Sequence, residues 1–278
     1  MEWINVENKN NNNNVKSPIK YFGGKNGFAG KIIEHFPDGY QLMNYIEPFA
    51  GSAALLFHKE ISPVEIINDL DSNLVALYNT IRDSDAFDKF KSILDLTPYS
   101  EELHYTWYKD LKGDISEVER AYRYFYVNRT AYNGLGGFSI SSVIRRGMSK
   151  SVSDYLSAVD GLYEVHNRLS KVVVSNRDGI GMIKKWDIDN TFIYSDSPYA
   201  NETRSAGRYK FDFTDDMQDS YLDVLVNMKS AKVLVSGYNC ERYRKLEDAG
   251  YRRIDMEIKT QNNNSKGKSK IESLWRNY

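Results

Sequence analysis

Residues 42–82 read LMNYIEPFAGSAALLFHKEISPVEIINDLDSNLVALYNTIR, and this stretch contains one pattern twice. Each copy begins with a short apolar run, passes through a turn of small and acidic residues, and continues with apolar residues at helical spacing. We expect strands at 42–46 and 64–67, a helix that begins at 53–58, and a helix over 72–82. Two strand–turn–helix units in succession predict a parallel, doubly wound sheet, because a right-handed crossover returns the chain to the same sheet.

Sheet-type strands continue in the second half of the chain, after a long interruption. They are predicted at 171–175, 192–194, 232–236 and 253–258, with a further helix over 214–228. The interruption, residues 85–165, is polar, rich in tyrosine and mostly helical, and it contains a glycine-rich loop or hairpin. We therefore predict a Rossmann-like α/β core at 17–84 and 166–278 that is split by this helical insertion. Residues 1–16 are Asn-rich and polar, and we expect an arm without a core of its own.

The composition limits the class of protein. Lysine and arginine number 37 and aspartate and glutamate 38, so a net charge of −1 argues against a uniformly basic nucleic-acid binder but is compatible with a local basic face. The single cysteine, Cys240, excludes an intramolecular disulfide and a cysteine-cluster zinc site, and with four histidines we expect no metal. No apolar run reaches about 18 residues and the N-terminus lacks an apolar signal core, so we expect a cytoplasmic protein.

The 21 tyrosines and 12 phenylalanines suit either core packing or stacking on bases.

Polar side chains follow the first two predicted strands. Ligands of open α/β sheets bind outside the carboxyl ends of the strands, so residues there are candidates for a binding site. Glu47-Pro48-Phe49 follows the first strand, and Gly51 allows the backbone to approach a ligand, although any tight turn also uses glycine. Asp69 ends the second strand, where an acid suits the two hydroxyl groups of a ribose. The alternative for Asp69 is a helix N-cap, a role that Asp71 or Ser72 could also take.

A third acid, Asp178, follows the strand predicted at 171–175. It is positioned to accept a hydrogen bond from an adenine amino group, and the alternative is an ordinary loop acid. The chain lacks the lysine motif of P-loop ATPases, and EPFAGS does not match the glycine fingerprint of nicotinamide enzymes. The absence of both motifs disfavours ATP chemistry and hydride transfer.

The strand predicted at 192–194 is followed by Asp196-Ser197-Pro198-Tyr199. The Asp196 carboxylate and the Ser197 main-chain carbonyl are two acceptors, which together can hold both N–H groups of an exocyclic amine. The ring of Tyr199 can stack on the base that bears this amine. The alternative is a simple turn with proline at a favoured position. The pocket for a planar amine is preferred because the other strand ends suit a nucleoside ligand.

Six segments, in the order of the chain, resemble the DNA adenine-N6 methyltransferases of the Dam/DpnM kind, the D12 or alpha group. In that family the cofactor motif precedes the target-recognition insert, and a D-P-P-Y motif follows it. The segments are KYFGGK (20–25), YIEPFAGSAAL (45–55), INDLDSNLVALY (67–78), VNRTAYNGL (127–135), DSPY (196–199) and SKGKSKIESLWRNY (265–278). The resemblance covers residues 17–278.

The resemblance implies a Rossmann-like methyltransferase that uses S-adenosylmethionine, yields S-adenosylhomocysteine, needs no metal, and acts on an adenine flipped out of double-stranded DNA. Nothing in the sequence demands a dimer, and we expect a monomer. The target adenine would be held by Asp196, Ser197, Pro198 and Tyr199. The cofactor would be surrounded by Tyr21, Gly23, Gly24, Lys25, Glu47, Pro48, Phe49, Gly51, Asp69, Leu70, Asp178 and Asp196. The insertion at 85–165 would recognise the target, with DNA contacts from Arg129, Tyr132, Asn133, Leu135, Arg145 and Arg146.

The sequence departs from the family at two positions. Ser197 stands where the family has proline; it supplies the same backbone carbonyl but lacks the ring that restricts φ, so we expect retained but slower catalysis. Gly137 stands where GATC-methylating relatives carry an arginine that reads guanine, so recognition of GATC is not expected, and Arg145 and Arg146 could read bases or bind phosphates. Three alternatives stay open: a DNA-binding relative with weakened or lost catalysis, methylation of cytosine N4, and methylation of adenine in RNA.

Overall fold

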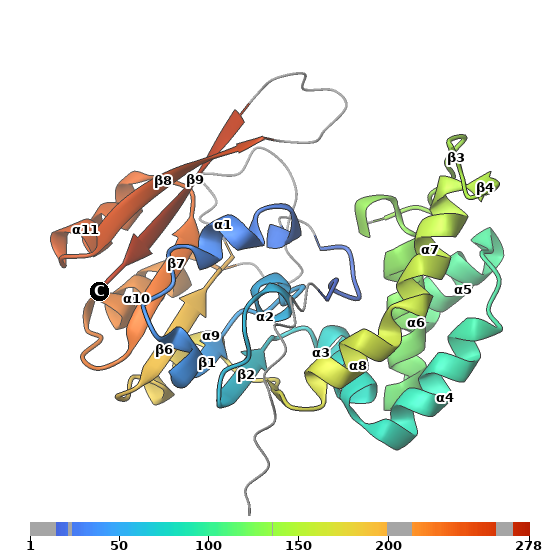
Figure 1. The fold of residues 1–278 in the computed structure, drawn as a ribbon, viewed down its shortest axis with the longest axis horizontal. Coiled ribbons are helices and arrows are strands. Elements are labelled where there is room, and N and C mark those ends of the chain that lie inside the picture. Colours follow the sequence, from blue (N-terminus) through green and yellow to red (C-terminus); the bar gives the residue numbers. More distant parts are fainter. Residues whose placement is uncertain (1–14, 22–23, 135, 199–212, 260–268) are drawn as a thin grey trace, which may run out of the picture.

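The computed structural model describes residues 15–21, 24–134, 136–198, 213–259 and 269–278. Among these residues, seven strands form one sheet in the order β5-β2-β1-β6-β7-β9-β8 (Figure 1). The strands are β1 (Asn44–Glu47), β2 (Val64–Asn68), β5 (Val173–Ser175), β6 (Thr191–Ser195), β7 (Lys232–Gly237), β8 (Arg252–Lys259) and β9 (Ser269–Arg276). The neighbouring strands β5, β2, β1, β6 and β7 are parallel, and β9 runs antiparallel to both β7 and β8. The predicted α/β fold with a mostly parallel sheet is confirmed.

Helices cover both faces of the sheet. Successive side chains of a strand point to opposite sides, so an apolar strand has side chains to bury on each face. Tyr45 and Phe192 pack in one apolar core with α1, α2 and α3, whereas Ile46 and Ile193 pack in a second core with α9, α10 and α11. The helices are α1 (Ala29–Ile33), α2 (Ala54–His58), α3 (Ser72–Arg82), α9 (Gly179–Lys185), α10 (Asp215–Val226) and α11 (Arg244–Asp248). Burial on both faces explains why these strands are continuous apolar runs in the sequence.

The strand order creates a switch point beside β1. From β1 the chain moves to β2 and later to β5, and it then returns to β6 on the other side of β1. The register pairs Ile46 of β1 with Ile66 of β2 and with Ile193 of β6, so the carboxyl ends of these three strands lie at one edge. The loops that follow them therefore meet where open α/β sheets bind ligands.

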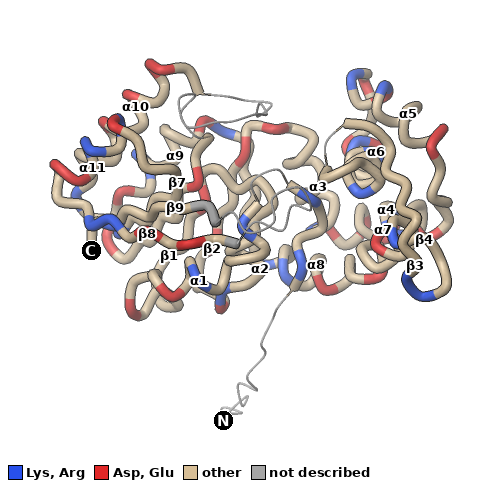
Figure 2. The backbone as a smooth tube through the Cα atoms, turned by 90° about the horizontal axis from the view of Figure 1, so that it is seen from above, with Lys and Arg blue, Asp and Glu red and all other residues tan. Residues whose placement is uncertain are grey.

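A helical part lies beside the sheet, as Figures 1 and 2 both show. It consists of α4 (Ser84–Asp95), α5 (Glu101–Asp110), α6 (Glu117–Thr130), α7 (Lys150–Asp160) and α8 (Leu162–Leu169), with a hairpin of β3 (Ile144–Arg145) and β4 (Met148–Ser149). A capping box begins α6, in which Ser116 and Glu119 accept hydrogen bonds from each other's backbone N–H groups. The hairpin forms where the sequence predicted a loop or hairpin, and Arg146 lies in its turn.

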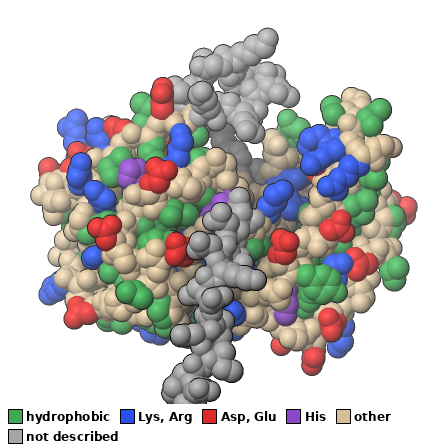
Figure 3. Space-filling view, in the orientation of Figure 1, with side chains coloured by type: hydrophobic (Ala, Val, Ile, Leu, Met, Phe, Trp, Pro, Cys, Tyr) green, Lys and Arg blue, Asp and Glu red, His purple; other side chains and the backbone are tan. Residues whose placement is uncertain are grey.

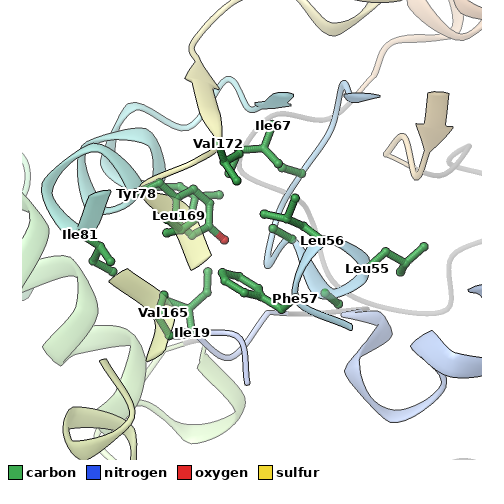
Figure 4. Packing of buried hydrophobic residues seen from close by; sticks show 14 of the residues in the cluster. Ile19, Leu55, Leu56, Phe57, Ile67, Tyr78, Ile81, Val165, Leu169 and Val172 are labelled. Carbon is green, nitrogen blue, oxygen red and sulfur yellow. The ribbon is translucent and has the colours of Figure 1, made fainter. Parts of the chain in front are cut away.

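One apolar core continues from the sheet into the helical part. Figure 4 shows Phe57 of α2, Ile67 of β2, Tyr78 of α3 and Leu169 of α8 packed around one another. The same core includes Phe125 of α6, because α3 packs on both α6 and α8. The helical part is thus packed directly on the sheet through α3.

Buried ion pairs join β2 to the helix that returns the chain to the sheet. Glu65 of β2 lies between Lys59, which follows α2, and Arg168 of α8. Lys59 Nζ is 2.5 Å from Glu65 Oε1, and Arg168 Nη2 donates to the same oxygen at 2.8 Å. All three side chains are buried. A buried charge without its partner is strongly destabilising, so this network holds α8 in place on β2.

Two predicted strands are shorter in the structure. The strand expected at 42–46 begins at Asn44, because residues Tyr40–Leu42 form a 3-10 turn. The strand expected at 171–175 begins at Val173, because α8 extends to Leu169 and leaves little chain before the sheet. Of the predicted N-terminal arm, residues 1–14 lie outside the described part of the chain.

Candidate active site

Glu47, the last residue of β1, is buried at the strand end. Its Oε1 accepts hydrogen bonds from the Tyr45 hydroxyl at 2.7 Å and from the Leu56 N–H at 2.9 Å. Burial raises the pKa of Glu47 to about 7, although both hydrogen bonds favour the ionised form. The Asp196 carboxylate, which follows the neighbouring strand β6, adds to this rise.

Asp69 follows β2 and connects two turns. Its Oδ2 accepts from the Gly51 N–H and its Oδ1 from the Asp71 N–H, each at 2.9 Å. Asp71, and not Asp69, caps α3, because the Asp71 side chain accepts from the Asn73 N–H. Gly51 has a φ of +47°, and a Cβ there would lie 2.9 Å from Cε1 of Tyr21. The structure thus rules out the helix-cap alternative for Asp69 and leaves this acid beside Tyr21 and the Gly51 turn.

Asp178 and Phe49 meet at the next loop. Asp178 caps α9, and its Oδ2 accepts from the Gly181 N–H at 2.7 Å. The ring of Phe49 lies against Gly179, where a Cβ would be 2.3 Å from Cε1 of Phe49. The Asp178 carboxylate therefore has a structural role as a helix cap, and its contact with an adenine amino group stays a prediction.

Asn68 connects these turns, and sequence reasoning missed it. Its Nδ2 donates to the carbonyl oxygens of Pro48 and Arg177, both at 2.8 Å, and its Oδ1 accepts from the Arg177 N–H at 2.9 Å. The side chain is buried at the end of β2. The available signal was a polar amide that closes an otherwise apolar strand directly before Asp69.

Lys25 reaches the turn after β6 from a short 3-10 helix, η1 (Lys25–Gly27). Its Nζ lies 3.0 Å from Asp196 Oδ1 and 3.1 Å from Oε1 of Glu272 on β9. Lys25 and Glu272 are both buried, and Glu272 also accepts a hydrogen bond from Ser236 at 2.7 Å. Lys25 was predicted beside the cofactor, and in the structure it contacts the candidate catalytic acid. Glu272 was not predicted; its signal in the sequence was an acid between the apolar residues Ile271 and Leu274 of the terminal strand.

Ser197 and Pro198 follow Asp196 in this turn. Ser197 is 1% exposed, and its hydroxyl lies near the phenol oxygens of Tyr221 and Tyr243 without a well-formed hydrogen bond among the described residues. Gln218 Nε2 donates to the Pro198 carbonyl at 2.6 Å. The extra hydroxyl that serine brings has therefore gained no clear partner.

The end of α6 carries the predicted DNA contacts, and the N-terminal segment supports it. The Asn128 side chain accepts from the Lys20 N–H at 2.8 Å and donates to the Lys20 carbonyl at 2.7 Å. Lys20 Nζ donates to the carbonyl oxygens of Arg129 and Ala131 at 2.9 and 3.4 Å. Beyond this point Tyr132 is 68% exposed. Asn133 is also exposed, with a left-handed φ of +51°.

A cavity of about 520 Å³ lies between the N-terminal segment, α6, the hairpin and α7. Its basic lining residues are Lys16, Lys20, Arg129, Arg145 and Arg146. Arg129 is half-buried, and burial lowers its pKa to about 10. Arg145 pairs with Asp154 at 2.7 Å, and Arg146 donates to Ser157 at 2.9 Å. Lys and Arg side chains gather on this side of the molecule, over the hairpin and α7 (Figure 3).

The structure brings most of the predicted cofactor residues to one edge of the sheet. Tyr21, Gly51 and Asp69 are in contact there, Lys25 and Asp196 are paired there, and Leu70 is exposed beside them. The Gly24 N–H donates to the Tyr21 carbonyl at 3.0 Å, which closes the turn before Lys25. The predicted DNA contacts at Arg129, Tyr132 and Asn133 lie at the end of α6. Three predicted site residues, Gly23, Leu135 and Tyr199, lie outside the described part of the chain.

The sequence pattern of a known family matches most of the chain. Residues 21–261 match the D12 class N6 adenine-specific DNA methyltransferase family. The chain belongs to this family. Its activity is therefore the transfer of a methyl group to N6 of adenine in DNA. The matched region of this D12 methyltransferase contains Asp69, Asp178 and Asp196, whereas Lys20 and Glu272 lie outside it.

Three relatives of this D12 methyltransferase are similar over most of its length. The Type II methyltransferase M.MjaIII of Methanocaldococcus jannaschii is 27% identical across 84% of this chain and 88% of its own. The Type II methyltransferase M1.LlaDCHI of Lactococcus lactis subsp. cremoris is 27% identical across 67% of this chain and 66% of its own. The DNA adenine methylase of Escherichia coli K12 is 23% identical across 66% of this chain and 64% of its own. The chain thus spans just under two thirds of the last two relatives.

The described residues of this methyltransferase contain neither a candidate metal site nor a candidate membrane-spanning helix. No group of three or more His, Cys, Asp or Glu side chains there could hold a metal ion. Within the same residues, no helix combines the length and the apolar character needed to cross a membrane.

Proposed function

We propose that this D12 methyltransferase transfers the methyl group of S-adenosylmethionine to N6 of an adenine that is rotated out of double-stranded DNA. The observation that carries the proposal is the position of Asp196, Ser197 and Pro198 at the switch point of the sheet, beside Glu47 and next to the turns of Gly51 and Asp69. The donor site and the turn that would hold the base therefore share one edge of the sheet.

The residues at this edge fit the proposed cofactor. When bound, S-adenosylmethionine supplies a methyl group activated by a positively charged sulfur. Four carboxylates, Glu47, Asp69, Asp196 and Glu272, belong to this edge, where Lys25 contacts Asp196 and Glu272, and a group of acids suits a cation. The Asp69 carboxylate would accept from the ribose hydroxyls, and Phe49, Leu70 and Asp178 would surround the adenine moiety. Tyr21, Gly24 and Gly51 would line the methionine side.

The turn after β6 would hold the target amine. The amino group of adenine is a poor nucleophile, because its lone pair is delocalised into the ring. The Asp196 carboxylate and the Ser197 carbonyl would accept its two N–H groups and so favour a tetrahedral nitrogen. Lys25 would keep Asp196 oriented, and the carboxylate would offset positive charge that develops on the nitrogen. Holding the nitrogen in line with the methyl group supplies much of the acceleration.

The helical part would recognise and open the DNA. An adenine inside a duplex cannot reach the turn after β6, so it has to leave the base stack. The exposed Tyr132 and Asn133 would contact the opened duplex. Arg129, Arg145 and Arg146, which line the cavity between α6, the hairpin and α7, would bind phosphates or base edges. With glycine at position 137, we do not expect the guanine contact that an arginine would make.

One experiment tests the assignment of the catalytic acid. We expect Asp196→Ala to abolish methyl transfer, because one of the two acceptors for the target amine is removed, while binding of S-adenosylmethionine stays measurable by calorimetry. Transfer of a tritiated methyl group to duplex DNA from cells that lack adenine methylation measures the first quantity. Full activity of Asp196→Ala would overturn the assignment.

The same assay separates the alternatives. Digestion of the product DNA and chromatography of the nucleosides distinguishes N6-methyladenine from N4-methylcytosine, and RNA offered in place of DNA tests the third substrate. Binding of S-adenosylmethionine without transfer to any nucleic acid would instead favour a catalytically inactive relative. Serine at position 197, where the family has proline, is the observation that supports this last candidate. Sedimentation of the purified chain tests the proposed monomer.

A further inference from the structure

Two side chains of α10 hold the two ends of the turn that contains Asp196. The Tyr221 hydroxyl lies 2.7 Å from Oγ of Ser195, the last residue of β6, and Gln218 Nε2 donates to the Pro198 carbonyl at 2.6 Å. Gln218 and Tyr221 are three positions apart, so they lie on one side of the helix. Both are buried, with 1% and 0% of their surface exposed. The proposed acceptors, the Asp196 carboxylate and the Ser197 carbonyl, lie between these two attachment points.

The contact from Gln218 determines the direction of the neighbouring Ser197 carbonyl. Only φ and ψ of Pro198 separate the Ser197 carbonyl from the Pro198 carbonyl. The pyrrolidine ring holds φ of Pro198 near about −65°. A hydrogen bond to the Pro198 carbonyl restrains ψ, so the orientation of the Ser197 carbonyl is set relative to α10.

Ser197 makes this restraint necessary. A proline at position 197 would restrict its own φ, and serine does not. The Ser197 hydroxyl does not replace that restriction, because it has no well-formed hydrogen bond among the described residues. Without a proline ring at position 197, the backbone of the turn has to be restrained by another part of the chain. Gln218 can do this, because its side chain donates a hydrogen bond to the Pro198 carbonyl.

Gln218 is also an unfavourable residue for stability alone. Its Oε1 is buried and has no hydrogen-bond partner among the residues that the structure describes. Buried polar atoms without partners are uncommon in proteins and destabilise the folded state. An apolar side chain of similar volume would avoid this cost, which indicates that the donor, Nε2, serves the turn.

We propose that Gln218 is a positioning residue for methyl transfer, which fixes the Ser197 carbonyl for the target amine by holding the Pro198 carbonyl. This inference rests on the proposed role of Asp196 and Ser197. Tyr221 supports the other end of the turn, where β6 already restrains the backbone through its pairing with β7. Gln218 is therefore expected to affect the rate more than Tyr221.

Single-turnover methylation of duplex DNA at saturating tritiated S-adenosylmethionine tests the proposal. The variants are Gln218→Met, which keeps the volume without the donor, Gln218→Glu, Tyr221→Phe, and Ser220→Ala as an exposed control on the same helix. We expect Gln218→Met to lose about 100-fold in rate, because a small misplacement of reacting groups has effects of that size. Binding of S-adenosylmethionine is expected to change less than about threefold, which separates positioning from a general loss of structure.

Two further readouts would not respond to a merely structural role. In Gln218→Glu a carboxylate cannot donate, but a protonated carboxyl can, so its rate relative to the unmodified chain is expected to rise as the pH falls. In a Ser197→Pro background the ring restricts the turn, so Gln218→Met is expected to cost much less than about 100-fold. If Gln218→Met does not fold, Gln218→Glu carries the same test.

The proposal is overturned if Gln218→Met or a folded Gln218→Glu retains at least about a third of the normal rate across the pH range. It is equally overturned if the loss is the same in the Ser197→Pro background, or if cofactor binding falls in parallel with the rate. Asp196→Ala is assayed beside these variants. An active Asp196→Ala would mean that the proposed site is wrong. An inactive Asp196→Ala together with an active Gln218→Met would contradict only the proposed role of Gln218.

Discussion

Glu47 is a carboxylate whose chemistry is changed by burial. Its ordinary pKa is 4.5, and burial raises it to about 7 in the folded chain. The folded state therefore binds the proton more tightly than the unfolded state does. The contribution of this group to stability is fully present below about pH 4.5 and is lost as the pH rises through about 7. The shift corresponds to about 3 kcal/mol.

A glutamine at this position tests the effect. In Glu47→Gln the carbonyl oxygen can still accept from the Tyr45 hydroxyl and the Leu56 N–H, but the titration is removed. Between pH 5 and 8, we expect the free energy of unfolding of Glu47→Gln to decline by about 3 kcal/mol less than that of the unmodified chain. Urea unfolding at several pH values measures it, with Glu60→Gln as an exposed control. Parallel pH profiles for Glu47→Gln and the unmodified chain would contradict the expectation.

The sequence predicted the position of the acids at the strand ends, but not the role of each one. Asp69 and Asp178 both follow predicted strands, and both lie at the expected edge. Which of Asp69 and Asp71 caps α3 could not be read from the sequence, because both precede the helix and both are acids. The Asn73 N–H donates to the Asp71 carboxylate, so Asp71 is the cap of α3. Which acid takes the cap position depends on the backbone angles there and not on residue type.

At the scale of elements, α8 depends on a buried charge for its position. Removing Arg168 would leave Glu65 with Lys59 alone in a buried site. We expect Arg168→Met to lower the free energy of unfolding by about 3–5 kcal/mol, as is usual when one member of a buried network is lost. Denaturant unfolding measures this, and Lys171→Met removes a nearby exposed charge as control. A loss below about 1 kcal/mol would show that the network contributes little.

The contact between the N-terminal segment and α6 is also a property of elements. Asn128 binds both backbone groups of Lys20, and the loop with Tyr132 follows directly. Loss of these two buried hydrogen bonds is expected to release the end of α6, because each contributes about 1 kcal/mol.

Asn128→Ala should therefore weaken DNA binding more than cofactor binding. We expect an affinity for duplex DNA about tenfold lower, which corresponds to about 1.4 kcal/mol. Fluorescence anisotropy with labelled DNA and calorimetry with S-adenosylmethionine measure the two affinities, and Asn167→Ala is an exposed control. Equal losses of both affinities, or no loss of either, would argue against a specific support for the DNA-binding loop.

For the whole molecule, the distribution of charge matters more than its sum. The net charge is −1, yet basic side chains gather around the hairpin and the neighbouring cavity (Figure 3). Electrostatic attraction to DNA responds to such a local field, and phosphate contacts make it dependent on salt.

The salt dependence of DNA affinity tests this distribution. If Arg145 and Arg146 each neutralise a phosphate, replacing both with alanine should reduce the slope of log affinity against log salt by about two. Lys184→Ala, an exposed change on α9 away from the hairpin, should leave the slope unchanged. An unaltered slope in the double variant would mean that the intramolecular contacts to Asp154 and Ser157 account for these arginines.

The sequence by itself determined the alternation of strands and helices and the acids at the strand ends. These features follow from local periodicity and from strand direction, which neighbouring residues specify. The strands predicted at 42–46 and 171–175 begin later, at Asn44 and Val173, because an adjacent turn and an adjacent helix compete for the preceding residues.

Only the tertiary structure decided the contacts of Lys25 with Asp196 and Glu272, of Gln218 with Pro198, and of Asn128 with Lys20. Each joins residues that belong to different segments and are not neighbours in the sequence. Their approach depends on how β9 inserts between β7 and β8, and on how α10 and α6 pack. No local pattern encodes such pairs, because many polar residues have the same chemistry and only packing selects which of them meet.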